Sequence, residues 1–300
     1  MPTRSVSRTS MPCWAAGPPQ AATVVFLHGA TADHRSWDPQ VASLSDRFRT
    51  VTVDLRGHGE SPEAGFDFDA AVDDVLDLLA DLDRPVALVG LSLGGALAQE
   101  VVYRAPEVVD ALVVADATCV TAARPVWEKP LALAALSGMA WLPEKVFHRR
   151  AARALAADAE ARADLEEWTP GAAAQVLSSL VTALHSDPGY RLPVPTLLLH
   201  GADDRAGDIA RSTRAWARRD PTAEYVVLPD AGHVSNVDNP EAFTAELRSF
   251  LDRALPVPAG RRRPWWARIP GGAPWSRRPR TAVPDVPVPD RAARGSGQPV

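Results

Sequence analysis

Short apolar runs alternate with amphipathic stretches along most of this chain. The apolar runs have the length of strands, and they occupy residues 23–27, 50–54, 85–89, 111–115, 196–200 and 224–228. Between them, apolar side chains recur at helical spacing over residues 37–48, 68–82, 96–104, 208–219 and 240–255. Strands that lack polar alternation are typical of a parallel sheet covered on both faces. The pattern therefore predicts an α/β fold with a mostly parallel sheet and helices on both faces.

The alternation stops between residues 118 and 193, which are rich in Ala, Leu, Glu and Arg. This segment predicts three or four helices and no strand. A helical insertion between two parallel strands covers their carboxyl ends, where open α/β sheets bind ligands. Its uncharged run from Leu131 to Leu142 is expected to face the core of the segment on one side and the ligand cleft on the other. The tryptophans of the segment are expected in its core: Trp127, Trp141 and Trp168.

These patterns divide the chain into regions. Residues 23–117 and 194–255 are expected to form the α/β core, and residues 118–193 an inserted helical cap. Residues 1–22 are polar and interrupted by proline, and they are a candidate edge hairpin. Residues 256–300 combine many prolines with arginine and tryptophan. Because this composition cannot build a core, we predict that the tail is disordered.

The charge is divided unevenly along the chain. The net charge is −5, from 32 Lys and Arg and 37 Asp and Glu. Residues 256–300 hold nine Arg and two Asp, which leaves 23 of the 32 basic and 35 of the 37 acidic residues in residues 1–255. An acidic body argues against nucleic acid as a partner. We therefore expect a small-molecule substrate.

The two cysteines, Cys13 and Cys119, give no disulfide framework, which favours a reduced, cytoplasmic setting. Neither has neighbours at metal-ligand spacing, so no metal is expected. The longest uncharged apolar stretch, Leu131 to Leu142, is shorter than the roughly 20 residues that a membrane-spanning helix needs. We therefore expect no membrane span.

The pattern G-x-S-x-G joins the apolar run 85–89 to the following helix, as Gly90-Leu91-Ser92-Leu93-Gly94. At such a corner the serine takes strained backbone angles that expose its hydroxyl. The glycines lack the Cβ atoms that would clash where strand and helix approach each other. The free N–H groups at the start of the helix can bind an oxyanion. The pattern predicts that Ser92 is a nucleophile.

A serine hydroxyl needs a base within hydrogen-bond reach, and the base needs an acid that orients it. At this type of corner the chain order is serine, acid, histidine. The loops after the last two predicted strands contain Asp204 and His233. Because parallel strands end at one edge of the sheet, both loops can converge on Ser92. Asp116, at the end of the strand before the helical insertion, and Asp203 remain alternatives for the acid.

An oxyanion hole needs a second N–H group besides that of Leu93, the residue after the serine. The strand at 23–27 ends in His28-Gly29-Ala30, which places the Ala30 N–H as the expected second donor. Polar residues of the neighbouring loops are expected to brace turns rather than to react: His28, Asp54, Arg56 and His58.

Five stretches occur in an order that has a known counterpart. They are LHGA at 27–30, DLRGHGES at 54–61, GLSLGG at 90–95, PTLLLHGADDR at 195–205 and AGHV at 231–234. Together they resemble the α/β-hydrolase fold family of cofactor-free serine hydrolases, which includes esterases, enol-lactonases and perhydrolases. The resemblance covers residues 20–255. It implies Ser92 as nucleophile, His233 as base, Asp204 as acid, Ala30 and Leu93 as oxyanion donors, and no cofactor.

The expected function is that of a serine hydrolase that cleaves a carboxylic ester or lactone through an acyl-enzyme intermediate. The apolar helical insertion predicts a small-to-medium, mainly apolar substrate. Carbon–carbon bond hydrolysis and cofactor-free perhydrolysis on the same triad are alternatives. Carbon–carbon hydrolases of the family often have Asn where Leu91 stands, which favours ester chemistry. A non-catalytic, ligand-binding member of the fold is the alternative from another class.

Overall fold

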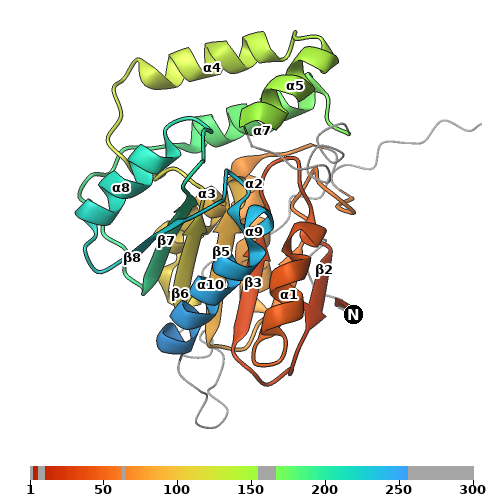
Figure 1. Ribbon diagram of the computed structural model, residues 1–300, viewed down its shortest axis with the longest axis vertical. Coiled ribbons are helices and arrows are strands. Elements are labelled where there is room, and N and C mark those ends of the chain that lie inside the picture. Colours follow the sequence, from red (N-terminus) through yellow and green to blue (C-terminus); the bar gives the residue numbers. More distant parts are fainter. Residues whose placement is uncertain (1–2, 6–10, 63–64, 155–166, 256–300) are drawn as a thin grey trace, which may run out of the picture.

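The computed structural model describes residues 3–5, 11–62, 65–154 and 167–255. An eight-stranded sheet in the order β1-β2-β4-β3-β5-β6-β7-β8 forms its centre (Figure 1). Neighbouring strands from β4 to β8 pair in parallel, whereas β2 pairs antiparallel with both β1 and β4. The strands are β1 (Thr3–Ser5), β2 (Cys13–Ala16), β3 (Thr23–Leu27), β4 (Arg49–Val53), β5 (Val86–Leu91), β6 (Ala111–Ala115), β7 (Thr196–Gly201) and β8 (Glu224–Leu228). The predicted mostly parallel α/β sheet is confirmed.

Helices cover both faces of this sheet (Figure 1). One core cluster combines side chains of α1 and α10 with one face of the strands, and the other combines α2, α3 and α8 with the opposite face. The helices are η1 (His34–Trp37), α1 (Asp38–Leu44), α2 (Phe68–Ala80), α3 (Leu93–Arg104), η2 (Pro106–Val108), α4 (Glu128–Met139), α5 (Glu144–Ala154), α7 (Pro170–Ala183), α8 (Ile209–Arg219), α9 (Ser235–Asp238) and α10 (Pro240–Ala254).

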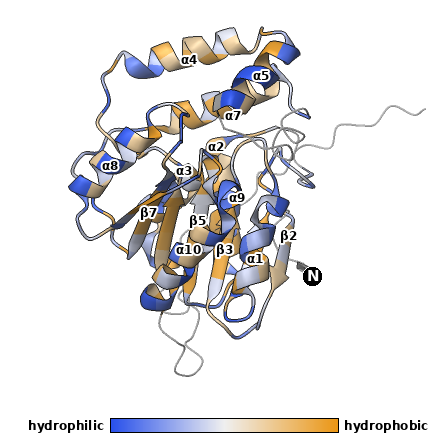
Figure 2. Cartoon of the chain, viewed as in Figure 1, coloured by the Kyte–Doolittle hydropathy of each residue, from blue (hydrophilic) through white to orange (hydrophobic). Residues whose placement is uncertain are grey.

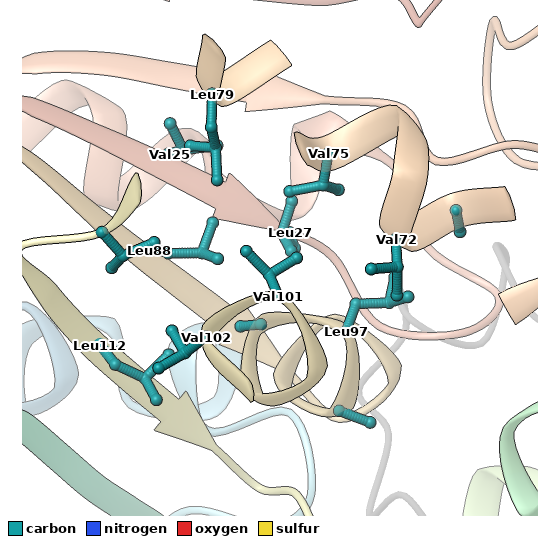
Figure 3. Packing of buried hydrophobic residues seen from close by; sticks show 14 of the residues in the cluster. Val25, Leu27, Val72, Val75, Leu79, Leu88, Leu97, Val101, Val102 and Leu112 are labelled. Carbon is teal, nitrogen blue, oxygen red and sulfur yellow. The ribbon is translucent and has the colours of Figure 1, made fainter. Parts of the chain in front are cut away.

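Successive residues of β3 enter the two cores in turn. Val24 and Phe26 pack with α1 and α10, and Val25 and Leu27 pack with α2 and α3 (Figure 3). All four side chains are 0% exposed. Burial of one such side chain contributes about 1.5–3 kcal/mol to stability. A central strand therefore needs apolar residues on both faces, which explains the absence of polar alternation in the sequence.

The helix predicted at 37–48 is shorter than expected. A 3-10 turn, η1, precedes α1, and α1 ends at Leu44. Ser45 then donates its hydroxyl to the carbonyl of Val41 at 2.6 Å, a local bond that competes with continuation of the helix. The apolar spacing continues because Phe48 still packs in the core, where it is 3% exposed.

Within the described residues between β6 and β7, the helices α4, α5 and α7 lie together beyond one end of the sheet (Figure 1). Trp168, just before α7, packs on His58 in the loop after β4, with ring centroids 4.8 Å apart. The hydroxyl of Ser179 in α7 accepts the backbone N–H of Phe68 at 2.9 Å. These contacts place α7 next to the carboxyl ends of the strands and next to α2.

The outer helix α4 is not placed as the sequence predicts. All twelve of its residues are described, and none is buried. Trp127 and Trp141, expected in the core of the segment, are 62% and 89% exposed. The side of α4 expected to face the ligand cleft is open to solvent, and α7 lies between α4 and the sheet (Figures 1 and 2). Trp168 alone of the three tryptophans packs against the main core cluster.

Three expectations fall partly or wholly outside the described residues. The disorder predicted for residues 256–300 lies outside them, as do the stretch 155–166 of the helical segment and residues 1–2 and 6–10 of the candidate edge hairpin. Within the described residues, no helix is both long and apolar enough to cross a bilayer.

Candidate active site

Ser92 stands at a sharp corner between β5 and α3. Its backbone angles, φ 51° and ψ −111°, lie outside the ordinary regions for an L-residue, so the surrounding structure must hold it there. A Cβ atom on Gly90 would lie 2.2 Å from the carbonyl oxygen of Gly94. A Cβ atom on Gly94 would lie 2.2 Å from the carbonyl oxygen of Leu27. Glycine is therefore required on both sides of the corner.

Ser92, His233 and Asp204 form one hydrogen-bonded chain. The hydroxyl of Ser92 lies 2.9 Å from Nε2 of His233, and Nδ1 of His233 lies 3.0 Å from Oδ2 of Asp204. A carboxylate only accepts, so the Nδ1 proton is donated to Asp204 and Nε2 is left to accept from the serine. Asp204 also accepts the backbone N–H of Ala206 at 2.8 Å through Oδ1. Its side chain is 0% exposed.

The loops that carry Asp204 and His233 touch each other. A Cβ atom on Gly201, the last residue of β7, would lie 2.1 Å from the carbonyl oxygen of Gly232. Asp238 in α9 accepts the backbone N–H of Gly232 at 2.8 Å. The position of the imidazole is therefore determined by backbone packing at the sheet edge as well as by its acid partner.

The electrostatic environment makes His233 a stronger base than a free histidine. Burial alone would lower its pKa, but the hydrogen bond and the charge of Asp204, with a further contribution from the charge of Asp116, raise the pKa overall. The imidazolium form is thus favoured when a proton arrives at Nε2.

The start of α3 and the loop after β3 both lie next to Ser92. Leu93 is the first residue of α3, and the N–H groups of a helix's first turn have no partner within the helix. The loop after β3 passes beside the serine, since a Cβ atom on Gly29 would lie 3.6 Å from the Cβ of Ser92. Ala30 follows directly in that loop. The two residues predicted as oxyanion donors therefore belong to the two segments that meet at this corner.

His28 holds this loop against the loop after β4. Its Nδ1 donates to the carbonyl of Gly29 at 2.8 Å, and its Nε2 accepts the N–H of Leu55 at 3.0 Å. Burial lowers the pKa of His28 to about 4. The ring therefore stays neutral near pH 7 and keeps the acceptor that the Leu55 N–H requires.

Asp116, an alternative for the acid, occupies a different place. Its Oδ1 accepts the N–H of Gly201 at 2.9 Å, and its Oδ2 accepts the N–H and the hydroxyl of Ser235 at 3.1 and 2.5 Å. Burial raises the pKa of Asp116 to about 7, against the His233 charge and the bonds from Ser235 and Gly201, which lower it. Asp116 thus ties the loop after β6 to the loops that follow β7 and β8. The other alternative, Asp203, is exposed.

Ser235 is the site residue that the sequence does not reveal. It is 0% exposed and binds Asp116 through both its N–H and its hydroxyl. Its position two residues after His233 was the available clue, but a serine at a helix start has many structural roles.

One group within the described residues has the spacing of a metal site: Asp33, His34 and Asp54. Its atoms already bind each other and their neighbours. His34 donates its N–H and its Nδ1 proton to Oδ1 of Asp54, each at 2.8 Å, and Asp33 pairs with Arg35. Asp54 also accepts the N–H of Glu60 at 2.7 Å. These bonds brace the loops that follow β3 and β4.

Adding a methyl group at Gly94 should push the start of α3 away from β3. We expect Gly94→Ala to lower the free energy of unfolding by about 1–3 kcal/mol, because the clashing atoms are backbone atoms that cannot rotate away. Gly138→Ala in α4 is the matched control. Its Cβ would have nothing within 4 Å, so stability should rise by up to about 1 kcal/mol. Urea unfolding measures both, and equal effects would contradict the close approach at the corner.

Comparisons with known proteins identify the family of this chain. The family model described as alpha/beta hydrolase family matches residues 24–247. The chain is 30% identical over 251 residues to 2-(acetamidomethylene)succinate hydrolase of Mesorhizobium japonicum, covering 76% of this chain and 87% of that protein. It is 26% identical over 250 residues to 3-oxoadipate enol-lactonase 1 of Acinetobacter baylyi, covering 78% and 90%. A thermophilic esterase from Thermogutta terrifontis has the same fold, with a TM-score of 0.66, 22% identity and coverage of 85% and 100%. This chain belongs to the α/β hydrolase family.

Proposed function

We propose that this protein is a serine hydrolase that cleaves a carboxylic ester or lactone through an acyl-enzyme intermediate. The observation that carries the proposal is the hydrogen-bonded chain Ser92–His233–Asp204, whose serine lies at the first turn of α3. A nucleophile, a base and an orienting acid in this order are the parts that acyl transfer needs.

In the proposed reaction, Ser92 attacks the acyl carbonyl carbon while Nε2 of His233 takes the hydroxyl proton. Asp204 holds the imidazole in the required tautomer and stabilises the imidazolium that forms. The N–H groups of Ala30 and Leu93 bind the oxyanion. The imidazolium then protonates the leaving oxygen, and the acyl group stays on Ser92. His233 next activates a water molecule, which attacks the acyl-enzyme and releases the acid.

The proposed substrate is small to medium-sized and mainly apolar. Ala30, beside the serine, and Trp168, before α7, pack against the same apolar cluster as Leu93. The buried face of α7 consists of Pro170, Ala173, Ala174 and Val176. We propose that residues 118–193 act as a cap over the active site. Its inner helix, α7, supplies an apolar wall of the substrate pocket. The cytoplasmic setting remains a prediction from the sequence.

A series of p-nitrophenyl esters tests the chemistry and the substrate class together. We expect kcat/KM to rise several-fold per methylene from acetate to hexanoate, because each buried CH₂ contributes about 0.8 kcal/mol, and to fall for dodecanoate. Ser92→Ala should lower kcat by about 10⁴-fold or more. Ser137→Ala, which removes a hydroxyl from exposed α4, is the matched control and should leave kcat unchanged.

Three outcomes would contradict parts of this proposal. Ser92→Ala with a tenth of wild-type activity would refute the mechanism. A flat chain-length profile would refute the apolar wall. The two relatives named above are a hydrolase of a succinate derivative and an oxoadipate enol-lactonase. Strong preference for an acidic over a neutral lactone would therefore place this chain with dicarboxylate-derived substrates instead.

Substitution of Asp204 and of Asp116 by asparagine should have different effects on kcat and on stability. Asp204→Asn should lower kcat by about 10⁴-fold, because an amide no longer selects the required tautomer of His233. Asp116→Asn should lower kcat less than tenfold but cost about 1–3 kcal/mol of stability, since its amide would present N–H to a donor such as Gly201. Asp203→Asn is the exposed control. A larger loss of kcat in Asp116→Asn than in Asp204→Asn would exchange the two roles.

The pH dependence of kcat/KM tests the contribution of Asp116 to the pKa of His233. Activity requires neutral His233, so kcat/KM should fall as the pH drops through the pKa of His233, which lies above the ordinary value of 6.5. Asp116, whose pKa lies at about 7, is only partly ionised over this range, and Asp116→Asn removes the charge that remains, so the acidic limb should move modestly to lower pH. An unchanged limb would contradict the electrostatic contribution of Asp116.

A further inference from the structure

The outer side of α4 presents a continuous apolar surface to solvent. Within α4, the exposed positions 131, 134 and 138 follow steps of three and four residues, which place them on one side of the helix, and the exposed Trp127 and Trp141 flank its two ends. Trp127 and Leu131 are each 62% exposed and Trp141 is 89% exposed. We call this surface the outer α4 face, and it consists of Trp127, Pro130, Leu131, Ala134, Ala135, Ser137, Gly138 and Trp141.

The polar groups of α4 are turned inward or satisfied locally. Lys129 donates from Nζ to the carbonyl of Leu184 at 3.0 Å, behind the helix. Glu128 pairs with Arg124 at 3.2 Å, and the hydroxyl of Ser137 donates to the carbonyl of Leu133 at 2.9 Å. The half-buried positions of α4 include Leu133, Leu136 and Met139, so the helix has apolar side chains on its protein-facing side as well as on its exposed side. An exposed apolar face of this kind marks a site of interaction.

Positive charge accompanies the outer α4 face. Residues 124–153 contain six Lys and Arg and two Glu, while residues 154–167, most of which lie outside the described residues, contain five Asp and Glu and one Arg. On the neighbouring helix α5, four of these cations are exposed: Lys145, Arg149, Arg150 and Arg153. Figure 2 shows α4, with its apolar residues, and the hydrophilic end of α5 together at the end of the molecule away from the sheet.

We propose that the outer α4 face and the α5 cations dock on the surface of an anionic phospholipid bilayer. Tryptophan side chains are enriched at the interface of a bilayer, and exposed lysine and arginine side chains are attracted to anionic lipids. The indole rings occupy the headgroup level, Leu131 reaches the acyl boundary, and the α5 cations bind the lipid phosphates. The protein lies on the bilayer without crossing it.

Charge decides against the other occupants of this surface. The tail at residues 256–300 contains nine Arg and two Asp, so it is repelled by the α5 cations. A two-fold symmetric contact that covers both α4 and α5 would bring two copies of the same positive patch into one interface. An anionic bilayer satisfies both the apolar face and the positive charge.

Co-sedimentation of the full chain with vesicles tests the proposal. One set of vesicles is phosphatidylcholine alone, and the other contains phosphatidylcholine and phosphatidylglycerol at about 3:1. We expect binding to the anionic vesicles at least about tenfold tighter than to the neutral ones, and weakened by salt. Sedimentation velocity without lipid measures the oligomeric state in parallel.

Two sets of substitutions locate the contact. Trp127→Ser, Leu131→Ser and Trp141→Ser combined should weaken binding to anionic vesicles about tenfold or more, as should Lys145→Glu, Arg149→Glu and Arg150→Glu combined. Melting temperature should not change, because these side chains are not buried. Val227→Ser on β8 removes an exposed apolar side chain elsewhere, 40% exposed, and should bind as the wild type does.

Three results would overturn the proposal. The first is that the wild-type chain binds neither kind of vesicle. The second is that the triple serine variant binds anionic vesicles as tightly as the wild type, because the lipid contact would then lie elsewhere, for example in the arginine-rich tail. The third is that the wild type is a dimer without vesicle affinity and the triple serine variant is a monomer, which would assign the surface to a second copy.

Discussion

The close approach of β3, β5 and α3 at one corner is the constraint on which the rest of the structure depends. A Cβ atom on Gly90 or Gly94 would collide with backbone atoms. Because glycine lacks this atom, the chain can turn from strand to helix within the single residue Ser92. That turn gives Ser92 a positive φ and places it at the N-terminus of α3. The loops after β3, β7 and β8 reach the same edge because their strands are parallel to β5.

The sequence predicts the sheet and this edge well because both depend on local patterns. Strand β3 must be apolar on both faces, and the corner must have glycine on both sides. Both requirements can be recognised as patterns in the sequence. His233 and Asp204 lie within hydrogen-bonding distance of their expected partners, while their catalytic roles remain proposals. The choice between Asp204 and Asp116 required the structure, because both follow parallel strands and only the direction of each carboxylate separates them. Asp116 is directed at Ser235, which no motif marks.

The helical segment shows where pattern reasoning fails. An apolar, uncharged helix is expected to be buried, and nothing in residues 131–142 indicates which side meets the protein. In the structure α7 meets the core, and α4 packs on α7 with its apolar outer face exposed. Trp127, Leu131 and Trp141 are therefore not buried by any part of the chain that the structure describes. We propose that contact with a lipid surface buries them and that this burial stabilises binding.

Covalent labelling of Ser92 tests the central claim most directly. A fluorophosphonate reacts with a serine only where a base removes its proton and N–H groups bind the phosphonyl oxygen. Our account predicts one adduct per chain, located by mass spectrometry on the peptide that contains Ser92, and formed far more slowly in His233→Ala. No adduct, an adduct on another serine, or labelling of Ser92 at the wild-type rate in His233→Ala would contradict the account.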